Sequence, residues 1–72
     1  MTRRSSMVIQ WSDADQVYIV TLPEFHSCKT HGRTYEEAGR MGQEVLEMLM
    51  EAYEADGRPL PEPAKYDDSA TA

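Results

Sequence analysis

Two groups of residues in this sequence have chemically reactive side chains and lie close together along the chain. The first is His26, Cys28 and His31, whose nitrogen and sulfur atoms are of the kind that bind zinc. Structural zinc takes four ligands, typically in paired motifs such as C-x2-C, whereas only three candidates lie together here. In an extended segment His26 and Cys28 share one face and His31 points the other way. We therefore interpret them as ordinary strand residues and predict no metal site and no cofactor.

Asp13 and Asp15 form the second group, because paired carboxylates can hold Mg²⁺ or act in acid–base catalysis. They lie among turn-forming residues, where Asp side chains bind nearby backbone, and no third carboxylate converges on them. A turn is the favoured interpretation, and a degenerate nuclease that uses this pair is a remote alternative. Cys28 as a nucleophile would need a positioned histidine base and a pocket that excludes water. We predict no catalytic residues and no enzyme activity.

The longest periodic segment runs from Thr34 to Gly57 and predicts one amphipathic helix. Thr34 and Glu37 form a capping box, in which each side chain accepts a hydrogen bond from the backbone N–H of the other residue. Gly57 predicts a left-handed end to the helix. The spacing predicts a buried stripe made of Ala38, Met41, Gly42, Val45, Met48, Leu49, Ala52 and Tyr53. The polar residues on the other side are Glu36, Arg40, Gln43, Glu47, Glu51 and Glu54.

Three segments before this helix predict β-strands, at residues 7–11, 17–22 and 26–30. The first two are joined by turn chemistry and predict a hairpin, and a bend at Pro23 precedes the third. The predicted fold class is α+β: a three-stranded antiparallel sheet with one long helix on one face, with room for a further short strand. We expect a single domain over residues 7–63, between flexible segments at 1–6 and 64–72.

The apolar surface is larger than one contact between a helix and a sheet can hide. Val17 and Ile19 face away from the side of the second strand that the helix should cover. Leu46 and Met50 extend the apolar arc of the helix, either as a second contact surface or as fringe residues. A domain of 72 residues is marginally stable alone. We therefore predict a homodimer whose interface contains Val17, Ile19, Leu46 and Met50.

The net charge of −6 disfavours direct nucleic-acid binding and favours a basic protein partner. No apolar run is long enough to span a membrane. The single cysteine fits a reducing compartment, and Arg3-Arg4 is not followed by the apolar segment of a secretory signal. The sequence thus indicates a cytoplasmic protein without membrane or nucleic-acid contacts.

The order of motifs resembles the HicB antitoxin family. The resemblance rests on Trp11 at the end of a strand, Val17-Tyr18-Ile19-Val20, Leu22-Pro23-Glu24-Phe25, Cys28, Thr30, Gly32, Thr34, Glu36-Glu37-Ala38 and Gly57-Arg58-Pro59-Leu60-Pro61-Glu62-Pro63. It covers about residues 8–63, and the combination is more specific than any one piece. It implies a partial RNase H-like core that binds and silences HicA, a small basic RNA-cleaving toxin. Many members also carry a C-terminal DNA-binding domain, which the residues after Pro63 are too few to form.

The leading hypothesis is therefore an antitoxin-like protein that neutralises a HicA-like toxin by direct contact. A stand-alone oligomeric structural or regulatory protein without a toxin is the alternative. We expect the partner to contact acidic residues together with one aromatic residue, namely Asp13, Asp15, Glu24, Phe25, Glu47 and Glu51.

Overall fold

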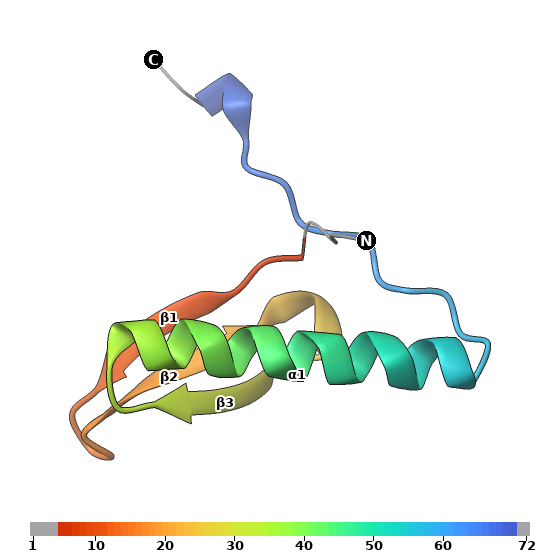
Figure 1. Cartoon of the computed structure of the whole chain (residues 1–72). Coiled ribbons are helices and arrows are strands. Elements are labelled where there is room, and N and C mark those ends of the chain that lie inside the picture. The colour runs from red at the N-terminus through yellow and green to blue at the C-terminus, as the bar shows by residue number, and fades with distance from the viewer. Residues whose placement is uncertain (1–4, 71–72) are drawn as a thin grey trace.

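A computed structural model of the chain describes residues 5–70 and consists of one small sheet and one long helix (Figure 1). The elements in chain order are β1 (Val8–Ser12), β2 (Val17–Leu22), the 3₁₀ turn η1 (Pro23–Phe25), β3 (Cys28–Gly32), α1 (Tyr35–Ala55) and the 3₁₀ turn η2 (Asp68–Ala70). The sheet is antiparallel in the order β1-β2-β3, and α1 lies across one of its faces. The predicted α+β architecture is confirmed.

The two faces of the sheet follow from the alternation of side chains along β2. Val20 and Leu22 are fully buried beneath α1, so Tyr18 on the same face also lies on the helix side. Val17 and Ile19 lie on the opposite face, which α1 does not cover. Residues paired across strands share a face, which assigns Trp11 to the helix side through its partner Tyr18.

The predicted strand boundaries differ from the structure in two places. β1 is shifted by one residue, to Val8–Ser12, and β3 begins at Cys28 rather than at His26. His26 and Ser27 both have left-handed backbone (φ 57° and 55°), which ends η1 and reverses the chain. A left-handed backbone cannot continue a strand, so β3 starts only after these two residues. The remaining predicted strand, Val17–Leu22, has the observed boundaries.

Both ends of α1 are capped, with one difference from the prediction. Thr34 Oγ1 accepts the Glu37 N–H at 3.0 Å, as the capping box requires. The Glu37 carboxylate, however, accepts the N–H of Arg33 at 2.7 Å rather than that of Thr34. At the other end Gly57 has a φ of 69°, and the N–H of Arg58 donates to the Tyr53 carbonyl at 2.9 Å. This is a Schellman motif, so the predicted stop at Gly57 is confirmed.

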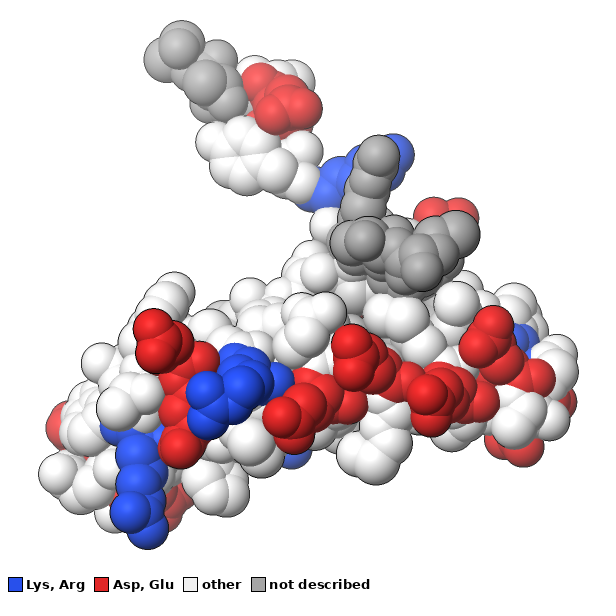
Figure 2. Space-filling model, viewed as in Figure 1, with Lys and Arg blue, Asp and Glu red and all other residues white. Residues whose placement is uncertain are grey.

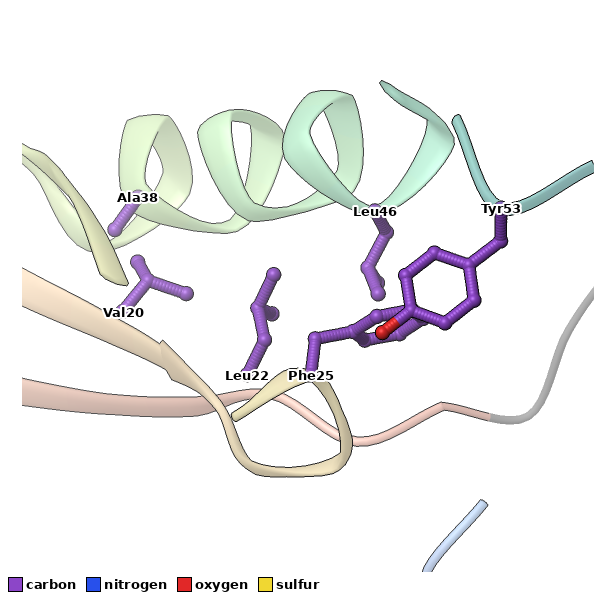
Figure 3. Close-up of a cluster of buried hydrophobic side chains, with 6 residues drawn as sticks. All are labelled: Val20, Leu22, Phe25, Ala38, Leu46 and Tyr53. Atoms are coloured by element: carbon purple, nitrogen blue, oxygen red, sulfur yellow. The ribbon is translucent and has the colours of Figure 1, made fainter. Parts of the chain in front are cut away.

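The core lies between α1, β2 and η1 and consists of Val20, Leu22, Phe25, Ala38, Leu46 and Tyr53 (Figure 3). Three positions on the helix depart from the predicted stripe: Ala52 is exposed, and Leu46 and Met48 are exchanged between core and surface. Leu46 is only 4% exposed, whereas Met48 is 62% exposed. Leu46 therefore belongs to the core of the single chain and is not available for the predicted dimer interface. The buried arc is rotated towards Leu46 because Phe25 packs against the C-terminal half of the helix from that side, where its ring meets Tyr53.

The first half of α1 approaches the sheet closely at two glycines. A Cβ on Gly32 would lie 2.4 Å from the Ala38 nitrogen, so only glycine permits this contact between β3 and the helix. A Cβ on Gly42 would lie 2.8 Å from Met7 Sδ and 2.9 Å from Val20 Cγ1. The expectation that Gly42 allows a close approach is thus confirmed. Gly39 has nothing within 4 Å of its Cβ position, and nothing in the structure explains it.

Candidate functional site

The outward face of α1 carries a row of exposed acidic side chains. The exposed glutamates on it are Glu36, Glu44, Glu47, Glu51 and Glu54. Figure 2 shows acidic side chains in a row along the length of the helix, interrupted by a basic one. Arg40 is the only basic residue between Tyr35 and Ala55, and its guanidinium lies 4.0 Å from the Glu37 carboxylate. The row therefore has a net negative field along the whole helix.

Met48 is an exposed apolar side chain within this acidic row. Glu44 precedes it by four residues and Glu51 follows it by three, so both neighbour it on the helix surface. A methionine side chain is flexible and polarizable, and it fits irregular partner surfaces. The outward face of α1 thus combines an apolar centre with acidic neighbours, as a protein-binding surface does.

The predicted partner residues Glu47 and Glu51 belong to this face, and both are exposed. Asp13 and Asp15 do not, because they lie in the β1–β2 turn. Asp13 Oδ1 accepts the indole N–H of Trp11 at 2.9 Å, and Trp11 lies on the helix side of the sheet. Asp15 borders a hollow on the opposite face. The two carboxylates therefore lie beside different faces of the sheet.

Phe25 is the one predicted partner residue that is buried. It is 4% exposed, and its ring meets the Tyr53 ring edge-to-face, with 5.5 Å between the ring centroids. An aromatic ring in this position supports the helix and has no surface to offer a partner. Phe25 is therefore a core residue, and its burial gives no support to the predicted contact with a partner.

Glu24 is half-buried and accepts hydrogen bonds from two segments of the chain, one before β1 and one after α1. Its carboxylate accepts the Ser6 N–H at 3.1 and 3.2 Å and the Ala64 N–H at 2.7 Å. The Ser6 hydroxyl donates to the Ala64 carbonyl at 3.2 Å, which joins the two segments directly. We call Glu24, Ser6 and Ala64 the carboxylate clasp. Glu24 is therefore engaged within the molecule, and its predicted role as a partner contact stays a prediction.

The hydrogen bonds of the clasp also set the charge state of Glu24. Partial burial disfavours the carboxylate and raises the pKa, but the bonds donated by Ala64 and Ser6 favour the charged form and outweigh burial. The net effect lowers the pKa of Glu24 below its ordinary value. Of the segments predicted to be flexible, residues 1–4 and 71–72 lie outside the described part of the chain, whereas Ser6 and Ala64 are both held by the clasp.

The face of the sheet opposite α1 carries Val17 and Ile19, two residues of the predicted dimer interface. Ile19 lies between Gln10 on β1 and His31 on β3, so polar side chains flank it on both sides. Val17 and Ile19 are each half-buried within the single chain. With Asp15 and His31 they line a shallow, open hollow of about 240 Å³. The fourth predicted interface residue, Met50, is half-buried against the core.

The histidine and cysteine side chains do not gather at one place. Cys28 packs against the core on the helix side, His31 lies on the opposite face, and His26 is in the left-handed turn. In the described residues 5–70, no group of three or more His, Cys, Asp or Glu side chains is placed to hold a metal ion. Within the same residues, no helix has the length and apolar character needed to cross a membrane.

Comparison of the chain with protein-family models, with curated proteins and with solved structures found no match in any of the three. The HicB resemblance and the RNase H-like assignment accordingly stay predictions from the sequence.

Sequence reasoning missed Met48, which it assigned to the buried stripe. The signal that identifies it is the spacing of Leu46 and Tyr53, seven residues apart and therefore on one side of the helix. A stripe centred on these two larger residues leaves Met48 on the surface.

Proposed function

We propose that this chain is a non-catalytic, antitoxin-like module that binds a small basic RNA-cleaving protein, similar to HicA, through the outward face of α1. The observation that carries the proposal is the row of exposed glutamates around Met48 on a rigid helix. The motif order that resembles HicB supports the same function. Such a protein would act in the cytoplasm, where an RNA-cleaving toxin finds its substrate.

Charge and apolar contact have separate tasks in this proposal. The glutamates attract a basic partner over a distance of about a Debye length, roughly 8 Å at physiological salt. This steering raises the association rate more than it raises the affinity. Met48 then supplies the contact from which water is excluded, since well-packed apolar centres carry most of the binding energy of an interface. The partner gains a complementary surface, and its basic RNA-binding residues are covered.

A growth assay tests the proposal directly. The probe is a HicA-like small basic ribonuclease, expressed at a level that arrests bacterial growth. We expect co-expression of the wild-type chain to restore growth and the two proteins to co-purify. The variant Glu47→Lys/Glu51→Lys should lose both effects, because it reverses the field at the centre of the row.

The matched control is Glu62→Lys/Asp68→Lys, which makes the same change in net charge on exposed residues outside α1. It should protect cells as the wild type does. Equal loss of protection in both variants would mean that overall charge, not the α1 face, is responsible. Failure of the wild-type chain to bind or protect would overturn the proposal and favour the stand-alone oligomer.

The non-catalytic part of the proposal has its own test. Purified protein should leave RNA intact in the presence of Mg²⁺ or Mn²⁺. Metal-dependent cleavage that disappears in Asp13→Asn would show that the chain is a nuclease.

A further inference from the structure

β1 is an edge strand without the features that usually protect such an edge. Its sequence is Val-Ile-Gln-Trp-Ser, which contains no charged residue and no proline. Val8 is 42% exposed and Trp11 is 48% exposed, on opposite faces of the strand. In the described part of the chain nothing pairs with the outer edge of β1, and the C-terminal tail runs away from the sheet (Figure 1). An uncharged, extended edge of this kind favours pairing with another strand.

The opposite edge of the sheet differs in each of these respects. β3 carries Lys29 and His31, both exposed, and ends at Gly32 beneath the helix. If β3 paired with its own copy about a two-fold axis at Thr30, Lys29 of one chain would face His31 of the other. A charged lysine on an edge strand is one of the features that protect such an edge from pairing. The chain therefore protects one edge of its sheet and leaves the other available.

We propose that β1 pairs with β1 of a second copy, antiparallel and about a two-fold axis at Gln10, to form a dimer. This register sets Ile9 of each chain opposite Trp11 of the other on the helix side. Aromatic and β-branched residues in opposite positions are favourable cross-strand pairs. The two three-stranded sheets then form one continuous sheet of six strands. Gln10 faces Gln10 on the other face, so no charges of equal sign meet at the axis.

A second copy fits this edge better than an unrelated strand does, because the arrangement is self-complementary. Each chain carries −6, and β1, unlike the other edge strand β3, has no charged side chain, so pairing there brings no charged side chains of the two strands together. The glutamates of α1 stay on the outward faces of both helices, free for other contacts. A contact of five residues per chain is small, so we expect a weak dimer with a dissociation constant on the order of 10 µM.

The test is sedimentation equilibrium of the purified chain from low to high micromolar concentration, with Gln10→Lys as the variant. The wild type should approach twice the 8.2 kDa mass of the chain as concentration rises. Trp11 is the only tryptophan, so its emission should shift to shorter wavelength over the same range, as Ile9 of the second copy covers it. In Gln10→Lys, two lysines meet at the axis, and the dissociation constant should rise on the order of tenfold or more.

Two further variants make the result specific. Gln43→Lys makes the same substitution at an exposed position on α1 and should dimerise as the wild type does. Ile19→Lys alters the face of the sheet rather than its edge and should also dimerise. Circular dichroism confirms that each variant is folded.

A wild-type chain that sediments at the monomer mass at every concentration would overturn the proposal. Loss of the dimer in Ile19→Lys would also overturn it, because that result would show that the two chains meet through the face of the sheet rather than through β1. The dimer and the binding of a basic partner are tested independently, since the sedimentation experiment contains no partner.

Discussion

The two halves of α1 are held by different means. The first half, from Tyr35 to Val45, lies on the sheet, where Gly32 and Gly42 permit close contact. The second half extends past the strands (Figure 1) and packs against side chains from η1 and the tail. Phe25 meets Tyr53 there, and the Arg58 guanidinium lies 4.1 Å from the centre of the Tyr53 ring. The first half of α1 needs positions without a Cβ atom so that the helix can approach the sheet. The second half needs large side chains that fill the space beside the helix.

This difference predicts opposite sensitivities along one helix. An added methyl group should damage the first half, because the backbone of the helix is already in contact with β3. A deleted ring should damage the second half, because it leaves a cavity between η1 and Tyr53. Helices that extend past their sheet depend on loops and tails, and this makes them responsive to solution conditions that loosen those segments.

The largest expected effect is from Phe25→Ala. Removal of a buried phenylalanine costs about 3–5 kcal/mol of unfolding free energy. A domain of this length is stable by about 4–11 kcal/mol, so urea denaturation should show a much less stable or partly unfolded protein. Hydrogen exchange should speed up most for residues 46–55. Equal acceleration of hydrogen exchange in both halves of α1 would contradict the distinction between them. A loss of unfolding free energy below about 1 kcal/mol would show that the Phe25–Tyr53 contact does not hold the second half in place.

Gly32→Ala should have the next largest effect, on the first half. The added Cβ would lie 2.4 Å from the Ala38 nitrogen, and this backbone atom cannot move without the helix. Overpacking of this kind costs about 3 kcal/mol. Urea denaturation measures the loss.

The matched control for Gly32→Ala is Gly39→Ala, at a position where a Cβ has open space. It should stabilise the protein by about 0.5–1 kcal/mol, because alanine favours the helix more than glycine does. If both glycine variants changed stability alike, close packing at Gly32 would not be the cause.

The smallest expected loss of stability is from Glu24→Gln, which weakens the carboxylate clasp. Hydrogen bonds to a charged group contribute about 1.5–3 kcal/mol, and solvent screening at the partly exposed Glu24 lowers this to about 1 kcal/mol. Because the pKa of folded Glu24 lies below its ordinary value of 4.5, the clasp stabilises the protein fully above that pH. This contribution is lost as the pH falls from 4.5 through the lower pKa of the folded state.

Chemical denaturation between neutral pH and the acid range measures this dependence. The difference in stability between wild type and Glu24→Gln should shrink as the pH falls. Glu62→Gln, an exposed glutamate of the same tail, serves as the control and should show no such change. A difference that stayed constant with pH would show that the ionised carboxylate does not hold the two segments.

Local signals were sufficient for several elements of this fold. Val17–Leu22 has its predicted boundaries because β-branched residues before a proline favour an extended chain wherever they lie. Thr34 and Gly57 mark the ends of the helix because capping acts between a side chain and backbone groups only a few residues away. Two of the predicted partner residues, Glu47 and Glu51, lie on the exposed face for a similar reason, since helix periodicity places them opposite the buried arc.

Other assignments required the packed chain. Leu46 is buried and Met48 is exposed, the reverse of the prediction, because Phe25 packs against the Leu46 side of the helix. The spacing of apolar residues in a helix does not show from which side a neighbouring loop will pack against it. The left-handed backbone at His26 and Ser27 has no glycine to signal it, so the start of β3 was misplaced. The protected β3 edge and the unprotected β1 edge likewise follow from strand order, which the hairpin sequence alone does not establish.

The sequence by itself determined the α+β fold, the two faces of β2, the helix with its caps, and the acidic character of the surface. The tertiary structure alone decided that Glu24 and Phe25 make contacts that hold distant segments of the chain together. Glu24 meets Ala64, which follows it by 40 residues, and Phe25 meets Tyr53 on the far half of the helix. Such contacts form only when distant segments are brought together by burial of the common core, and short-range periodicity cannot anticipate them.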